Sequence, residues 1–117
     1  MVSSFVGENE NIGKLYMAGK LEVEFTPQGT LAEKMRSGGN GIPAFFTKTG
    51  LGTIIEEGGV ITKYNLDGTP ANISKPKPKM VFNGQEYLME ETVRPDFAFV
   101  KGHIADTLGN VVFNKAA

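Results

Sequence analysis

The sequence contains no cysteine and a single histidine, and each shortage removes a class of functional site. Without cysteine the chain has no disulfide framework, no thiolate zinc site and no cysteine nucleophile. His103 alone provides no histidine cluster for a metal ion and no serine–histidine pair with nucleophile-elbow spacing. We therefore expect no metal site, and we expect His103 to line a strand or lie at the surface.

Long apolar runs and an excess of charge are also missing. No apolar run approaches the roughly 20 residues of a membrane-spanning helix, and the N-terminus resembles neither a signal nor a transit sequence. The formal net charge is -1, and no window combines a basic face with interleaved aromatic residues. The 117 residues suit one soluble domain with no membrane and no nucleic-acid partner.

Residues 21–52 form the most informative stretch of the chain. Leu21, Val23 and Phe25 alternate with glutamates, which is the pattern of a half-buried strand. Pro27 ends this strand because it lacks an amide donor. Thr30–Glu33 then fits a capping box that starts a helix, and the glycines at positions 38 and 39 end it.

Gln28 lies in the middle of the turn expected between this strand and this helix, Pro27-Gln28-Gly29. In open α/β sheets, ligands bind at the carboxyl ends of the strands. A neutral amide beside a helix N-terminus can donate to a carboxylate or thioester oxygen without adding charge. The spacing is equally compatible with a turn residue that bonds to local backbone.

The first forty residues predict strand, helix, strand and helix. Val2–Val6 predicts a short strand, and Glu8–Ala18 places Ile12, Leu15 and Tyr16 on one helical face before Gly19. This alternation favours an α/β domain with a parallel sheet and crossover helices.

Residues 40–79 are rich in glycine and proline and predict a long shaped loop region. In this region we expect short strands or packed loop segments at Ala44–Phe46 and Thr53–Ile55. We expect a turn at Asp67-Gly68, and we expect the second half of residues 40–79 to be exposed. The basic run Lys75–Lys79 is expected to be solvated and extended.

The last forty residues predict mainly β-structure. Asn83-Gly84 is a strong hairpin signal between two apolar runs. Phe97–Lys101 predicts a buried strand, residues 106–110 predict a turn, and Val111–Phe113 predicts a last strand whose neighbours lie outside these residues. The adjacent pairs Glu56-Glu57 and Glu90-Glu91 would point to opposite faces of strands and form no carboxylate dyad.

Long motifs in this chain resemble the α-half of family I 3-oxoacid CoA-transferases of the succinyl-CoA:3-ketoacid type. They are VSSFVGEN at residues 2–9, GKLEVEFTPQGTLAEKMRSGGNGIPAFFTKTGLGT at residues 19–53, and FAFVKGHIADTLGNVVFNKAA at residues 97–117. The resemblance implies part of an open, mostly parallel α/β domain with a β-rich C-terminal portion. It covers essentially all of residues 1–117 and implies a single partial domain, without the α-half's N-terminal start.

The resemblance also implies a reaction and its participants. A Glu of a complementary β-half attacks the acyl-CoA thioester and then carries CoA as a glutamyl-CoA thioester. Its Ser-Glu-Asn-Gly-like motif is absent here, and Gly7-Glu8-Asn9 matches an α-half segment without a nucleophile. The Gln of the T-P-Q-G-T motif lies near the reacting carboxyl and corresponds to Gln28, which is therefore the expected substrate-binding residue.

Several further expectations come from the resemblance. The substrates are acyl-CoA and a 3-oxoacid such as acetoacetate, in ketone-body metabolism, with coenzyme A as a substrate and no permanently bound cofactor. The partners are the β-half and other copies of the complete protein, in the mitochondrial matrix or in a bacterial cytoplasm. The chain alone is expected to be inactive. The alternative is a non-catalytic α/β fragment or interaction module.

Overall fold

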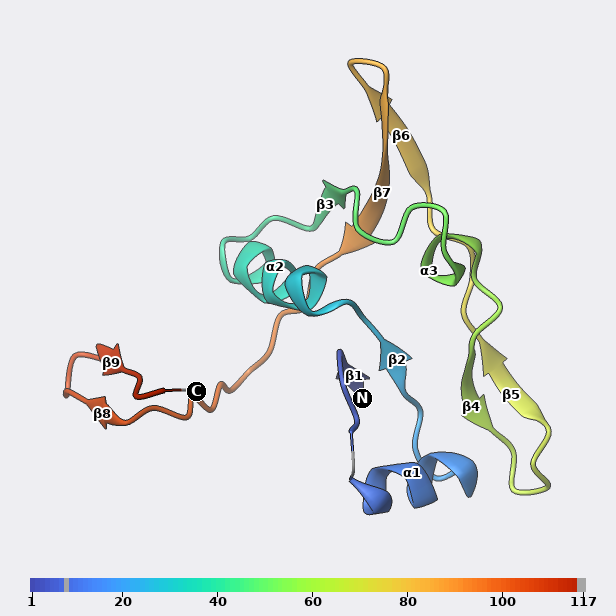
Figure 1. Cartoon of the computed structure of the whole chain (residues 1–117), viewed down its shortest axis with the longest axis horizontal. Coiled ribbons are helices and arrows are strands. Elements are labelled where there is room, and N and C mark those ends of the chain that lie inside the picture. The colour runs from blue at the N-terminus through green and yellow to red at the C-terminus, as the bar shows by residue number, and fades with distance from the viewer. Residues whose placement is uncertain (8, 116–117) are drawn as a thin grey trace.

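Helix α2 lies in the middle of the molecule, and the other elements extend from it in separate directions (Figure 1). The computed structural model describes residues 1–7 and 9–115. In chain order the elements are β1 (Val2–Ser3), α1 (Glu10–Met17), β2 (Glu24–Phe25), α2 (Gln28–Gly39), β3 (Ala44–Thr47), α3 (Ile54–Glu57), β4 (Ile61–Tyr64), β5 (Pro70–Ile73), β6 (Lys79–Phe82), β7 (Gln85–Glu91), β8 (Ile104–Ala105) and β9 (Val111–Val112). Within the described residues no helix has the length and apolar character needed to cross a membrane.

The strands form small, separate sheets. β1 and β2 pair in parallel, and β3, β7 and β6 form an antiparallel sheet in that order. β4–β5 and β8–β9 are antiparallel hairpins. The mixture of helices and strands confirms the α/β class. Within the described residues the expected parallel sheet is represented only by β1–β2, because the later strand pairs are all antiparallel.

The expected capping box is wrong. Helix α2 begins at Gln28 with Pro27 as its N-cap, and the Leu31 amide donates to the Pro27 carbonyl at 2.8 Å. Thr30 is therefore inside the first turn, and its buried hydroxyl has no hydrogen-bond partner among the described residues. The helix starts early because Pro27, whose φ is -54°, needs no amide donor at this position. The predicted end is confirmed within one residue, since Asn40 is the C-cap.

The region predicted as a long loop contains more regular structure than expected. Ala44–Thr47 is strand β3, whereas Thr53 caps the short helix α3 through a bond from the Ile55 amide. β4 and β5 form a hairpin closed by a bond from the Asn65 amide to the Thr69 carbonyl at 2.8 Å. The Asp67-Gly68 turn is confirmed, but its flanking residues are paired strands and not an open loop.

The C-terminal turns are predicted correctly, but two strand predictions are wrong. The last strand, β9, has a neighbour within these residues, because it pairs with β8. Asn83 and Gly84 both have positive φ, at 51° and 76°, as a two-residue hairpin turn requires, and they join β6 to β7. Asp106 organises the turn before β9 by accepting bonds from the Leu108 and Asn110 amides. The buried strand expected at 97–101 is wrong, because the segment has no regular structure and no pairing strand among the described residues.

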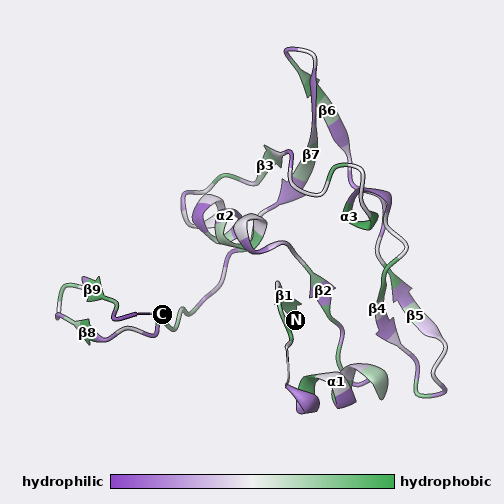
Figure 2. Ribbon diagram, in the orientation of Figure 1, coloured by the Kyte–Doolittle hydropathy of each residue, from purple (hydrophilic) through white to green (hydrophobic). Residues whose placement is uncertain are grey.

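The described residues enclose very little apolar core. Val23 and Leu88 are the buried hydrophobic residues, whereas Phe97 and Phe99 are 83% and 99% exposed. Apolar segments are spread over β1, α3, β8 and β9 (Figure 2). The radius of gyration is 16.9 Å, compared with about 13 Å for a compact domain of this length. The apolar side chains of this chain therefore need further protein surface to become buried.

Candidate functional site

Gln28 is exposed at the first position of α2, directly after the carboxyl end of β2. The amides of the first helical turn have no intrahelical partner and carry the positive end of the helix dipole. Among residues 1–7 and 9–115 no side chain caps this end, and the first turn contains no acidic residue. The N-terminus of α2 can therefore receive negative charge, with the Gln28 amide as an additional donor.

The β1–β2 pair fixes the entry to this helix. Ser3 pairs with Phe25 in the parallel register, and the Thr26 amide donates to the Ser3 carbonyl at 3.0 Å. Thr26 is buried, so the chain passes from β2 through Pro27 into α2 without a flexible connection. The predicted position of Gln28 at a strand-to-helix edge is confirmed, although Gln28 lies in the helix and not in a turn.

The buried face of α2 is polar and close to the end of β7. It consists of Thr30, Lys34, Ser37 and Gly38, at the spacing of one helical face. The Val93 amide donates to the Lys34 carbonyl at 3.2 Å, and the Ile42 amide donates to the Ser37 carbonyl at 2.9 Å. Hydrogen bonds and close backbone contact, with few apolar contacts, therefore hold α2 in place.

A cluster of charged residues, which we call the Glu90 cluster, joins α2 to its neighbours. It consists of Glu24, Lys34, Lys77 and Glu90. Glu90 Oε2 lies 3.0 Å from Lys34 Nζ and 2.7 Å from Lys77 Nζ, and Glu24 Oε1 lies 3.6 Å from Lys34 Nζ. The side chains of Glu90 and Lys34 are 1% and 7% exposed, so these charges are compensated inside the molecule.

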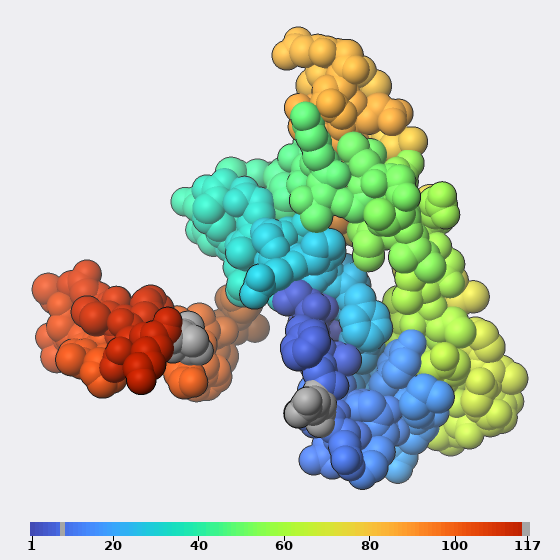
Figure 3. Space-filling model, in the orientation of Figure 1, coloured from blue at the N-terminus to red at the C-terminus, as the bar shows by residue number. Residues whose placement is uncertain are grey.

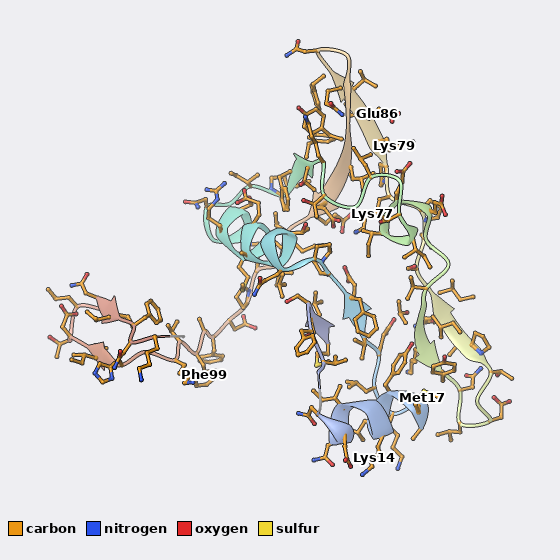
Figure 4. The ribbon with its side chains drawn as sticks, in the orientation of Figure 1. Lys14, Met17, Lys77, Lys79, Glu86 and Phe99 are labelled. Carbon is orange, nitrogen blue, oxygen red and sulfur yellow. The ribbon has the colours of Figure 1, made fainter. Side chains whose placement is uncertain are left out.

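Sequence reasoning missed this cluster. Lys77 and Lys79 are labelled in Figure 4, and the run to which they belong was expected to be solvated. Lys77 instead contacts Glu90, and Lys79 lies 2.6 Å from Glu56. The available signal was the period of two along β7, which places Glu90 on the same face as the buried Leu88.

A cleft of about 610 Å³ lies beside the Glu90 cluster. Figure 3 shows it as an opening between the surface of β1 and β2 and the surface of α3 and β4. The residues that line the cleft include apolar Phe25 and Ile55. They also include Glu24 and Lys77, which belong to the Glu90 cluster. Gln28 does not line this cleft, so the cleft and the α2 terminus are separate features.

The other candidate residues do not form a catalytic or metal-binding site among the described residues. His103 is exposed, and its backbone amide donates to Val112 in the β8–β9 hairpin. The described residues contain no group of three or more side chains that could hold a metal ion. Glu56 lies in α3 and not in a strand, and the hydrogen bond from Lys79 lowers its pKa. Glu8, from the Gly7-Glu8-Asn9 motif, lies outside the described residues.

The coenzyme A transferase family model matches residues 1–117. The chain belongs to the coenzyme A transferase family. It is 52% identical over 117 residues to human succinyl-CoA:3-ketoacid coenzyme A transferase 2, mitochondrial, covering all of this chain and 23% of that protein. It is 47% identical over 116 residues to one subunit of a probable succinyl-CoA:3-ketoacid coenzyme A transferase of Mycobacterium bovis, covering 99% of this chain and 47% of the bacterial one.

The fold of this family member also matches a solved structure. The crystal structure of the acyl-CoA transferase (YdiF) apoenzyme from Escherichia coli O157:H7 superposes with a TM-score of 0.70 at 23% identity. The match covers 96% of this chain and 21% of the other. The coenzyme A transferase chain described here thus spans less than half the length of the relatives it matches, and over that span it has the fold of the Escherichia coli structure.

Glu33, a half-buried residue of α2, gives a pH prediction. Hydrogen bonds from Arg36 and Ser37 hold the pKa of Glu33 at about 2, below its ordinary 4.5. Because the folded pKa is depressed, the stabilisation is complete above about pH 4.5 and is lost as the pH falls towards 2. In a pH series of melting curves, the Tm difference between wild type and Glu33→Gln should shrink over this interval.

The control for this prediction is Arg36→Ala, which removes the main hydrogen-bond donor. A ¹³C-carboxyl NMR titration should show the Glu33 midpoint moving back towards its ordinary value in this variant. An unchanged midpoint in Arg36→Ala would show that Arg36 does not cause the depressed pKa.

Proposed function

We propose that this chain is the substrate-contacting part of a CoA transferase that moves CoA between succinyl-CoA and a 3-oxoacid such as acetoacetate. The observation that carries this function is the position of Gln28 at the uncapped N-terminus of α2 in a coenzyme A transferase chain. The names of the relatives support the substrate pair, since they are succinyl-CoA:3-ketoacid transferases. Coenzyme A takes part as a substrate, and no permanently bound cofactor or metal is required.

The reaction uses a glutamate of the complementary half. Its carboxylate oxygen attacks the thioester carbonyl carbon, and the C–S bond breaks to give an acyl-glutamyl anhydride and the CoA thiolate. The thiolate then attacks the glutamyl carbonyl of the anhydride, which releases succinate and leaves a glutamyl-CoA thioester. The same steps in reverse order pass CoA to the 3-oxoacid. Gln28 and the first-turn amides of α2 donate hydrogen bonds to oxygen atoms that gain negative charge.

The complementary half is either a second subunit or a further part of the same chain. The bacterial relative is named as one subunit of its enzyme, whereas the human relative is a single chain of which this one covers 23%. The apolar residues left exposed here, among them Phe97 and Phe99, need surface that this chain does not supply. We propose that residues 1–117 are part of one domain, that the complete protein forms homo-oligomers, and that it works in the mitochondrial matrix or in a bacterial cytoplasm.

The test is direct detection of the covalent intermediate. The complete enzyme is incubated with succinyl-CoA without an acceptor, and intact-mass spectrometry is used to find a glutamyl-CoA adduct on the complementary half. Acetoacetate should then discharge the adduct as acetoacetyl-CoA. The isolated 117-residue chain, as a control, should form no adduct. If the complete enzyme neither forms the adduct nor transfers CoA, the alternative of a non-catalytic interaction module is correct.

A further inference from the structure

We infer that Lys34 is a positioning residue for Gln28 and that its ion pair with the buried Glu90 sets the rotation and axial position of α2. This inference rests on the proposed role of Gln28. Lys34 belongs to the same helix as Gln28, six residues later, so about 9 Å of helix separates them along the axis. A helical segment of this length moves as a rigid rod.

The geometry of this ion pair constrains the position of α2. Lys34 Nζ is 3.0 Å from Glu90 Oε2, and both side chains are almost completely buried. A buried charge that loses its partner is strongly disfavoured. Moving α2 by a single residue would rotate Lys34 by about 100° and shift it by about 1.5 Å, away from Glu90.

The rest of the interface holds α2 through backbone contacts, among them the bond from the Val93 amide to the Lys34 carbonyl, and Lys34–Glu90 is its buried side-chain ion pair. Its buried face is Thr30, Lys34, Ser37 and Gly38, which presents no large apolar side chain to β7. Lys34 also contacts the strand that leads into the helix, because Glu24 Oε1 of β2 lies 3.6 Å from Lys34 Nζ. Lys34 therefore connects β7, α2 and β2, and Gln28 lies between β2 and the rest of α2.

Lys77 supplies a matched control. Its Nζ lies 2.7 Å from the same Glu90 oxygen, but it belongs to the connection between β5 and β6 and not to α2. Removal of Lys34 leaves Glu90 paired with Lys77, and removal of Lys77 leaves Glu90 paired with Lys34. Both substitutions thus remove one cation from one buried carboxylate, and only Lys34→Met removes a side-chain tie between α2 and β7.

The experiment is a double-mutant cycle in the complete enzyme, with Gln28→Ala, Lys34→Met and the combined variant. We expect Lys34→Met to lower kcat about 10- to 100-fold, as displacement of a reactive group by about 1 Å does, with a smaller change in KM. Lys34→Arg should restore most of the activity, and Lys77→Met should stay within about threefold of wild type while changing Tm to a similar extent. If Lys34 acts through Gln28, the combined variant should be no worse than the more impaired single variant.

Each outcome of this cycle is decisive. If Gln28→Ala is impaired and the losses of the two single variants multiply, Lys34 does not act through Gln28 and the inference is wrong, while the proposed function stands. If Gln28→Ala keeps normal activity, the proposed site falls and the inference falls with it. If Lys34→Met does not fold, Lys34→Gln takes its place in the cycle, and multiplying losses would overturn the inference equally.

Discussion

Replacement of Gln28 by Ala in the complete enzyme should lower kcat/KM by about 10- to 1,000-fold while the Tm stays close to wild type. The loss is that of a hydrogen bond to an oxygen that is charged or gains charge, about 1.5 to 4 kcal/mol. The stability should hold because the Gln28 side chain is exposed and makes no hydrogen bond to another described residue. The helix start depends on Pro27, whose carbonyl accepts the first helical bond.

Gln28→Glu should be more damaging than Gln28→Ala. A carboxylate at this position is compatible with the dipole of α2, so the fold should persist. It would repel the acid substrate and the glutamate of the complementary half, and it would occupy the donors that should face the reacting oxygen. Steady-state kinetics with both substrates and melting curves for both variants are the measurements.

A matched control comes from the β6–β7 hairpin. Gln85 is an exposed glutamine at the β6–β7 turn, where its side-chain amide donates to the Glu86 carbonyl. Gln85→Ala should leave kcat/KM unchanged. Near-normal kinetics for Gln28→Ala, or unfolding of both Gln28 variants, would show that Gln28 only begins the helix.

Sequence reasoning found the position of Gln28, because local chemistry determines it. A strand followed by Pro27 and a helix places Gln28 at a helix N-terminus whatever else the chain contacts. The precise start of α2 was missed because the Thr30–Glu33 pattern fits a capping box. In the structure, the Glu33 carboxylate instead accepts bonds from Arg36 and Ser37.

The part that was missed depends on contacts between distant segments. Nothing near Lys77 in sequence indicates that it reaches Glu90, thirteen residues away in strand β7. The apolar run 97–101 has the composition of a buried strand, but a strand forms only beside a partner, and the described residues provide none. Composition therefore predicted the tendency of each segment, and the packing of the chain decided the outcome.

Replacement of Gly38 by Ala should destabilise the protein by about 2 to 3 kcal/mol, although Ala is the better helix former. A Cβ at Gly38 would lie 2.0 Å from the Val93 carbonyl oxygen and 2.9 Å from its carbon. These are backbone atoms, so no side-chain rotation can relieve the overlap. Moving Val93 away would break the bond from its amide to the Lys34 carbonyl.

Gly39→Ala is the matched control, one residue later in the same helix. A Cβ at Gly39 would meet nothing within 4 Å, so this substitution should be neutral or stabilise by up to about 1 kcal/mol. Thermal unfolding of the two variants in the complete enzyme should separate them clearly, with a lower Tm for Gly38→Ala alone. Because the close approach at Gly38 and the Lys34–Glu90 pair belong to one buried face of α2, Gly38→Ala should also reduce kcat below the melting temperature. Equal Tm values for the two variants would mean that α2 does not pack against Val93 as closely as this structure places it.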